Sequence, residues 1–253
     1  MLLQITDPSH PQDLSSSGLI VGIDLGTTHS VVATVKDHKP HVLRFGKESP
    51  LIPSLLTLDN DSLKVGIDRG HTLHSTKRLM HTPTTPLTLG SYSLTPLDVA
   101  TAILAHLKNR IETIAPLEAA VITVPAYFDE AARVATKQAA ALAGIKVLRL
   151  INEPTAAALA YGLACGTEGI YAVYDFGGGT FDLSLLKMTK GIFQVLATSG
   201  DLELGGDDID HALAEAQDIS IKEARFIKEA LSNSETCKGV SRQDLDDISL
   251  PFI

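Results

Sequence analysis

Short apolar runs, each closed by turn-forming residues, mark the beginning of the chain. Residues 18–24 are apolar and rich in β-branched side chains, and residues 30–36 resume the same character after a glycine-containing turn. This pattern predicts a strand, a tight turn and a returning strand. A third short strand is expected at about residues 42–45. Residues 53–86 are punctuated by Pro, Gly, Asn and Asp, which favours loops and short strands.

The hydrophobic period changes from strand-like to helix-like after Pro96. Within residues 97–115 one apolar stripe is formed by Val99, Ile103, Leu107 and Ile111. Spacings of three and four residues predict an amphipathic helix, and a proline suits its first turn. Residues 119–128 then have a buried-strand pattern. The Ala-rich segment that follows is predicted to be a helix that Asp129 caps and Gly144 closes.

The rest of the chain alternates strand-like and helix-like segments. Strands are expected at residues 146–152, 170–177, 180–188 and 193–200, and helices at residues 153–162, 205–216, 219–233 and 242–248. Strands that alternate with helices favour a layered α/β architecture.

One plan occurs twice along the chain. Residues 20–35 (IVGIDLGTTHSVVATV) and 171–186 (YAVYDFGGGTFDLSLL) each show an apolar strand, Asp, an apolar residue, Gly, two small residues and another strand. Asp24 aligns with Asp175 and Gly26 with Gly177. A single glycine-rich turn is equally well explained as a structural hairpin. Two copies with an acid at the same place are harder to explain in that way.

The chemistry that suits this repeat is phosphate binding. Glycine lets backbone N–H groups approach phosphate oxygens closely, and threonine hydroxyls add donors. The two carboxylates can hold a hydrated magnesium ion between the turns. The repeat therefore predicts two lobes that face one nucleotide, and a phosphoryl-transfer reaction in which the protein positions groups and stabilises charge.

Composition narrows the class of protein. The 253 residues are 44% hydrophobic, and the formal net charge is -9. An acidic chain argues against a nucleic acid or an anionic membrane as partner. Its two cysteines, Cys165 and Cys237, form no disulfide framework or paired metal-ligand motif, which favours a reducing compartment. We find no signal peptide and no apolar run long enough for a membrane span, so we expect a cytoplasmic protein.

Five ordered motifs resemble those of the 70-kilodalton heat-shock chaperones. They are IDLGTTHS, ITVPAYF, INEPTAAALAYG, YDFGGGTFD and LGGDDID, which run from residue 20 to about residue 210. The opening MLLQITDP and the stretch VLATSGDLELGGDDID are similar to the iron-sulfur cluster assembly branch of that family. The resemblance implies an α/β actin-like ATPase fold with two lobes, each with a mixed sheet and flanking helices. Residues 1–18 would form a flexible arm, 19–168 the first lobe and 169–253 an incomplete second lobe.

The resemblance also implies roles for residues that match the family motifs. Catalytic roles fall on Asp24, Lys77, Glu153, Asp175 and Thr180. Asp24 and Asp175 would bind magnesium through its waters, Lys77 would neutralise charge on the transferred phosphoryl group, and Glu153 would orient the attacking water. Each has a simpler alternative. The aspartates suit turns, and an isolated lysine is usually a surface residue. A glutamate favours a helix start, and Thr180 suits a strand as an ordinary β-branched residue.

Nucleotide contacts are implied at a larger set of positions, with ATP or ADP and Mg2+ as cofactors. They are Gly26, Thr27, Thr28, Gly177, Gly178, Gly179, Gly205, Gly206, Asp207, Lys228 and Ser232. Lys228 and Ser232 match an adenosine-contacting helix, although the neighbouring Arg225 and Glu229 depart from the family pattern. His29 stands where the family commonly has Asn. Pro125 and Arg133 match residues that relay the nucleotide state.

The chain is shorter than the family pattern between Arg78 and Ser91 and again between Ala216 and Ile221. It also stops before the segment that would complete the second lobe and the peptide-binding domain. We therefore expect weak nucleotide binding and slow or absent hydrolysis by this chain alone. By family, a J-domain co-chaperone and an iron-sulfur scaffold client would be its partners. The alternatives are a non-catalytic or degenerate actin-fold module and, less well matched by the motifs, a sugar or acetate kinase.

Overall fold

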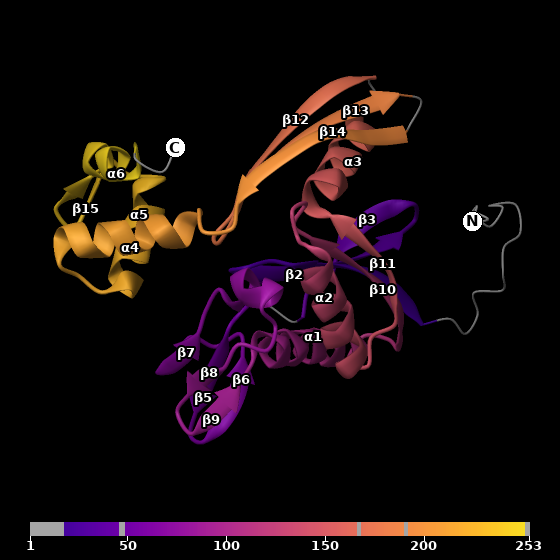
Figure 1. The fold of residues 1–253 in the computed structure, drawn as a ribbon, viewed down its shortest axis with the longest axis horizontal. Helices are drawn as coiled ribbons and strands as arrows, with labels where there is room; N and C mark the ends of the chain where they lie inside the picture. Colours follow the sequence, from indigo (N-terminus) through magenta and orange to yellow (C-terminus); the bar gives the residue numbers. More distant parts are fainter. Residues whose placement is uncertain (1–17, 46–48, 166–167, 190–191, 251–253) are drawn as a thin grey trace, which may run out of the picture.

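The computed structural model describes residues 18–45, 49–165, 168–189 and 192–250. The expected N-terminal arm, residues 1–18, lies almost wholly outside the described residues. Figure 1 shows the fold, with the first large sheet and its helices in indigo to magenta and the second sheet in orange.

A mixed sheet organises the first part of the chain, in the order β11-β10-β1-β2-β3, with β4 paired to β2. Its strands are β1 (Leu19–Leu25), β2 (His29–Lys36), β3 (Lys39–Val42), β4 (Ile52–Pro53), β10 (Leu117–Val124) and β11 (Val147–Asn152). β1 runs parallel to β10 and antiparallel to β2. The structure confirms the predicted strand, turn and returning strand. The third strand was misplaced: it already begins at Lys39, because Asp37 and His38 (φ 51° and 60°) make a tight hairpin turn without glycine.

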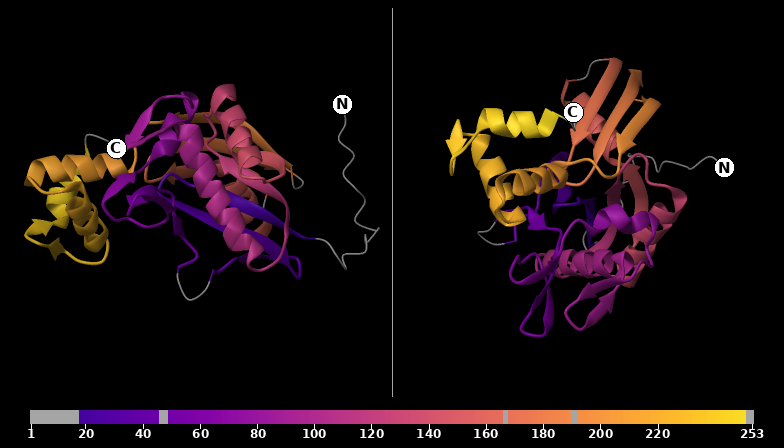
Figure 2. Two further views of the ribbon diagram at one scale, coloured as in Figure 1. Left: turned by 90° about the horizontal axis from the view of Figure 1, so that it is seen from below. Right: turned by 60° about the vertical axis from the view of Figure 1, so that its left-hand side comes forward.

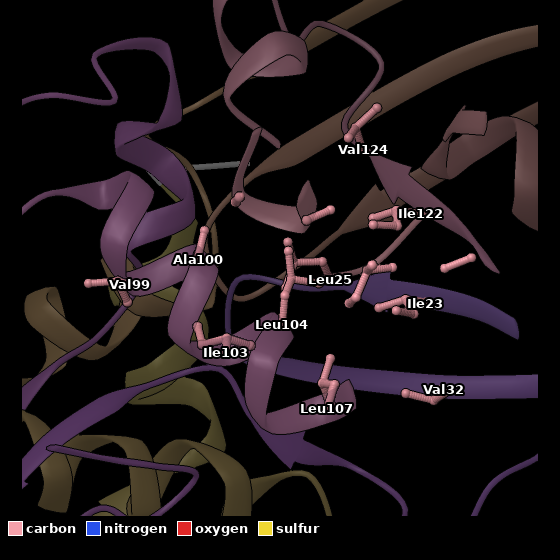
Figure 3. Close-up of a cluster of buried hydrophobic side chains, with 14 of the residues drawn as sticks. Ile23, Leu25, Val32, Val99, Ala100, Ile103, Leu104, Leu107, Ile122 and Val124 are labelled. Carbon is pink, nitrogen blue, oxygen red and sulfur yellow. The ribbon is translucent and has the colours of Figure 1, made fainter. Parts of the chain in front are cut away.

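Two helices cover this sheet and supply its core. α1 (Pro96–Glu112) begins with a capping box at Thr95, and α2 (Glu130–Leu142) is capped by Asp129 as predicted. The predicted stripe of α1 is buried against β1, β2 and β10, as Figure 3 shows for Leu107, Val32 and Ile122. Burying each such side chain contributes about 1.5–3 kcal/mol, which fixes the helix on the sheet.

The segment between β4 and α1 holds short elements that the sequence predicted only as loops and short strands. They are β5 (Leu56–Asp59), β6 (Ser62–Val65), β7 (His71–Leu73), the 3-10 helix η1 (Thr76–His81), β8 (Leu87–Leu89) and β9 (Tyr92–Leu94). η1 matters for function because it carries Lys77. Its N-cap, Ser75, has a left-handed backbone (φ 52°), which turns the chain sharply into the helix.

The second sheet is joined to the first by α3 (Glu153–Cys165), which follows β11 directly and packs against both sheets. It contains β12 (Gly169–Phe176), β13 (Phe181–Thr189) and β14 (Ile192–Asp201). Their pairings are all antiparallel. Among the described residues, the expected mixture of strand directions is therefore present in the first sheet only.

The chain ends in a small helical cluster that stands apart from the sheets, as Figures 1 and 2 show. Its elements are α4 (Gly206–Gln217), α5 (Ile221–Leu231), β15 (Thr236–Cys237), β16 (Val240–Ser241) and α6 (Arg242–Ser249). A separate hydrophobic cluster, centred on Leu213, Ile227 and Leu231, holds these helices together. The three helices were predicted, and the short β15–β16 pairing lies between the last two of them.

Candidate functional site

A cleft of about 420 Å³ lies where the two repeated hairpins meet. It is lined by Asp24, Gly26, Thr27, Thr28, His29, Lys77, Thr123, Glu153, Ala156, Ala157, Asp175, Gly177, Gly178 and Thr180. The five residues predicted to be catalytic are all in this set. The fold has therefore brought together segments that are separated along the chain by complete strands and helices.

The first wall of the cleft is the turn between β1 and β2. Asp24 lies at the end of β1, and its carboxylate accepts a hydrogen bond of 2.7 Å from the Thr123 hydroxyl on the neighbouring strand β10. Gly26 has no room for a side chain, because a Cβ there would lie 2.2 Å from the carbonyl oxygen of His29. The tight turn presents Thr27 and Thr28 to the opposite wall.

The second wall is the matching turn between β12 and β13. Asp175 ends its strand just as Asp24 does, and the Gly177 amide closes the turn on the Thr180 carbonyl at 2.9 Å. A Cβ on Gly178 would lie 1.8 Å from the Thr28 hydroxyl oxygen. One on Gly179 would lie 2.3 Å from the Thr27 methyl carbon. The two turns therefore face each other, and only glycine permits so close an approach.

Lys77 and Glu153 form an ion pair at the base of the cleft. The Lys77 ammonium nitrogen lies 2.5 Å from Glu153 Oε1. Burial raises the pKa of Glu153 above its ordinary value, although Lys77 opposes the shift, and the negative charges of Asp24 and Asp175 add to it. Three carboxylates thus share a poorly hydrated space with one lysine. Such a site attracts cations.

The pKa of Asp175 is also raised above its ordinary value. Burial raises its pKa, the nearby Asp24 carboxylate adds to the rise, and Lys77 partly offsets it. Two neighbouring carboxylates that repel each other are stabilised when a divalent cation lies between them. Among the described residues no group of three or more His, Cys, Asp or Glu side chains could hold a metal directly. Magnesium, which keeps several waters and needs only one or two carboxylates, fits this donor set.

The cleft also has an unused donor for an anion. The Thr28 hydroxyl oxygen is buried in the described structure and has no hydrogen-bond partner. A buried hydroxyl without a partner is costly, so a ligand oxygen at this point would relieve it. The Lys77 ammonium, on the same cleft surface, would add positive charge. These groups fit a phosphate chain together with its magnesium ion.

Asp182 was missed by the sequence analysis. It pairs directly with Asp175 across the β12–β13 hairpin, so the two side chains lie on the same face. It is almost fully buried, and one of its oxygens has no hydrogen-bond partner. Burial, with the charges of Glu153 and Asp175, raises the pKa of Asp182 to about 7. The available signal was an acid at an inward position of the alternating strand TFDLSLL.

Six of the predicted nucleotide contacts lie outside the cleft lining: Gly179, Gly205, Gly206, Asp207, Lys228 and Ser232. The amides of Gly206 and Asp207 donate to the carbonyls of Gly177 and Gly178 at 2.9 and 2.7 Å. Lys228 pairs with Asp210 at 2.5 Å, and Ser232 caps the end of α5. In this structure these groups hold the helices together and support the second turn from behind.

Arg133 connects the site to the loop after β10. It donates to the carbonyl of Phe128 and to the side chain of Asn152, each at 2.9 Å. Asn152 directly precedes Glu153, and Pro125 begins the loop that Phe128 closes. Arg133 therefore ties the position of Glu153 to that loop, which is the arrangement a relay would need.

These features define an α/β protein with the actin-like ATPase fold, in which paired hairpin turns form the walls of one cleft. A family model described as Hsp70 protein matches residues 20–82 and 74–238. The chain belongs to the Hsp70 family.

Curated relatives agree with this family. The chain is 42% identical to the "Chaperone protein HscA homolog" of Aliivibrio salmonicida over 291 aligned positions, which cover 99% of the chain and 46% of the relative. It is 46% identical to the protein of the same name from Histophilus somni, covering 85% of the chain and 40% of the relative. The chain thus spans about half the length of the curated relatives it matches. Because the first alignment is longer than the chain, that relative has internal segments that the chain lacks.

No helix in the described part of the chain is long and apolar enough to cross a membrane.

Proposed function

We propose that this chain binds Mg-ATP weakly in the cleft between the two repeated hairpins and hydrolyses it slowly. The observation that carries the proposal is the meeting of Asp24, Asp175, Lys77 and Glu153 around one cavity that also presents the unpartnered Thr28 hydroxyl. Asp24 and Asp175 would hold magnesium through its waters. The ion would supply positive charge to the phosphate oxygens.

The chain's own residues would divide the remaining work. Gly26, Thr27, Thr28, Gly177, Gly178 and Gly179 would hold the phosphates, and Thr180 would lie beside the terminal one. Lys77 would stabilise charge on the transferred group. Glu153 would orient a water molecule. Asp182, which is buried beside Asp175 and does not line the cleft, would act on Asp175 rather than on the nucleotide.

The wider role follows from the family. We propose an ATPase domain of a molecular chaperone that acts in iron-sulfur cluster assembly, in the cytoplasm, with a J-domain co-chaperone and an iron-sulfur scaffold client. The relatives named HscA homolog, at 42–46% identity, support this branch. We also propose residues 19–168 and 169–253 as the two lobes, with α3 contacting both sheets.

The adenosine contacts remain part of the proposal in a modified form. Lys228 is engaged with Asp210 and with the carbonyl of Gly206. Ser232 lies at the far end of the same helix. If Lys228 binds adenosine, its ammonium has to leave Asp210 and the Gly206 carbonyl. We therefore expect the phosphate contacts to dominate affinity for the chain by itself.

Calorimetry and single-turnover hydrolysis test the proposal. The chain should bind ATP more tightly with magnesium than with a chelator, and pre-bound ATP should release phosphate. Lys77→Ala and Glu153→Gln should abolish release. Lys108→Ala is a matched control, since Lys108 also pairs with a glutamate but on the surface of α1. Magnesium-dependent binding without phosphate release would support the non-catalytic module, and no binding at all would contradict the proposal.

A further inference from the structure

Both sides of Lys77 are tied to the beginning of α4. Ser75, two residues before the lysine, donates its hydroxyl to Asp207 Oδ2. Arg78, the residue after it, uses two guanidinium nitrogens to bind both carboxylate oxygens of Asp208, with Nη1 to Oδ1 at 3.0 Å. Paired N–H donors on one carboxylate fix orientation as well as distance. The backbone that carries Lys77 is thus held from the far side of the cleft.

The same turn of α4 also holds the second phosphate turn. The Gly206 amide donates to the Gly177 carbonyl and the Asp207 amide to the Gly178 carbonyl. Gly205 packs so closely that an added Cβ would lie 2.7 Å from the Gly178 carbonyl oxygen. Residues 205–208 therefore contact, through adjacent groups, both the Gly177–Gly178 turn and the segment that carries Lys77.

Arg225 keeps this helix start in place. Its guanidinium binds Asp207 Oδ1 at 2.6 Å and Asp210 Oδ2 at 2.7 Å. The Asp210 side chain is fully buried and also pairs with Lys228. Arginine bound to two carboxylates loses little freedom for each hydrogen bond that it makes. The first turn of α4 is therefore held firmly enough to fix the positions of the two segments that it contacts. These are the Gly177–Gly178 turn and the segment that carries Lys77.

We propose that Arg78 and Asp208 form an interlobe latch that sets the position of Lys77 relative to the Gly177–Gly178 turn. Arg78 and Asp208 are positioning residues for the reaction, because neither lines the cleft. This inference rests on the proposed function, since it assigns Lys77 to the transferred phosphate. A displacement of about 1 Å in such a group can cost about 10²-fold in rate.

Hydrolysis by latch variants tests the positioning role. Arg78→Ala should slow single-turnover phosphate release by about 10²-fold while changing ATP affinity by a much smaller factor. Arg78→Lys keeps the positive charge but not the two paired hydrogen bonds. Its rate of phosphate release should lie between the rates of Arg78→Ala and the unaltered chain. Lys222→Ala is the matched control. Lys222 also forms an ion pair with a residue of the first part of the chain, Asp68, but its side chain is 78% exposed. An Arg78→Ala rate equal to that of the unaltered chain would overturn the positioning role.

Exchanging the two charges, so that Asp stands at position 78 and Arg at position 208, distinguishes loss of the latch from a general loss of structure. Arg78→Asp alone should be slow. Adding Asp208→Arg should restore part of the rate, though not all, because a cation in the first turn opposes the helix dipole. A double variant no faster than Arg78→Asp would contradict the latch.

A distance measurement removes the dependence on hydrolysis. Spin labels at the exposed positions Ser62 and Glu215, with Cys165 and Cys237 replaced by serine, report the separation of the first lobe from α4. Arg78→Ala should broaden the distribution and extend it to longer distances without nucleotide, and Lys222→Ala should not. Unchanged distances would overturn the latch. If the unaltered chain does not hydrolyse ATP, the proposed function fails and these distances alone decide whether the latch exists.

Discussion

The ammonium nitrogen of Lys77 lies 2.5 Å from the carboxylate of Glu153, and the two side chains are only 10% and 15% exposed. One comes from a 3-10 helix between two small sheets and the other begins α3. Their pairing places a positive charge among three carboxylates. The cleft can thus receive phosphate and magnesium together.

The Lys77–Glu153 pair should be costly to break from one side. Lys77→Ala leaves Glu153 without its cation in a poorly hydrated place, so we expect a loss of about 3 kcal/mol in the free energy of unfolding. Lys108→Ala, at an exposed pair within α1, should change it by less than about 0.5 kcal/mol. Urea denaturation of both variants provides the comparison. Equal losses would mean that the buried pair contributes no more to the free energy of unfolding than the exposed pair.

Asp175 should matter mainly when magnesium is present. Asp175→Asn removes one of the two carboxylates that would hold the hydrated ion, which typically costs about 10–100-fold in metal affinity. We expect calorimetry to show that the variant has lost the magnesium dependence of ATP binding. Asp61→Asn, at an exposed hairpin turn, serves as the control. An Asp175→Asn chain that still responds to magnesium would contradict the assignment.

Asp182 should make stability depend on pH. Its pKa is about 7 in the folded protein and 3.8 in an unfolded chain, so the folded state keeps a proton that the unfolded state releases. Stability is therefore lost as pH rises from about 4 to 7. Asp182→Asn removes this loss, and we expect it to raise the free energy of unfolding at pH 8 by about 2–4 kcal/mol.

The pH profile of Asp182→Asn supplies its own control. At pH 4 the wild-type side chain is neutral in the folded state, so the variant should differ little from wild type there. Urea denaturation at both pH values tests this. A difference of the same size at pH 4 and pH 8 would show that the effect is not one of proton binding.

Gly205 should tolerate no side chain. An alanine Cβ would lie 2.7–2.8 Å from backbone atoms of Gly178 and Gly179, which cannot rotate away. Gly205→Ala should therefore lower the free energy of unfolding by about 1–3 kcal/mol. Gly169→Ala, where a Cβ meets nothing within 4 Å, should stay within about 0.5 kcal/mol of wild type. Thermal denaturation of the two variants tests the packing of α4 on the second turn.

Much of the fold could be predicted because local patterns carried it. The apolar stripe and the leading Pro96 predicted α1, and the Asp129 cap predicted α2. The apolar runs of β1–β2 and β12–β13 predicted their hairpins, since hydrophobic period and turn chemistry act over a few residues. The β3 boundary was missed because Asp37 and His38 adopt positive φ without glycine.

The repeated Asp-x-Gly turns also revealed the cleft from the sequence. They predicted two carboxylates and two glycine-rich turns around one nucleotide, and the structure places the two turns opposite each other. The sequence could not show that Asp182 is buried beside Asp175, because a pKa depends on what surrounds the group in space. Nor could it show that Lys228 turns towards Asp210.

The sequence by itself determined which residue types are available for phosphate chemistry and where the turns that hold them must form. Only the tertiary structure decided their partners. Lys77 meets Glu153, and Arg78 meets Asp208, across more than 70 and more than 120 intervening residues. Ion pairs of this kind form where η1 meets the starts of α3 and α4 in space, and no local pattern along the chain encodes them.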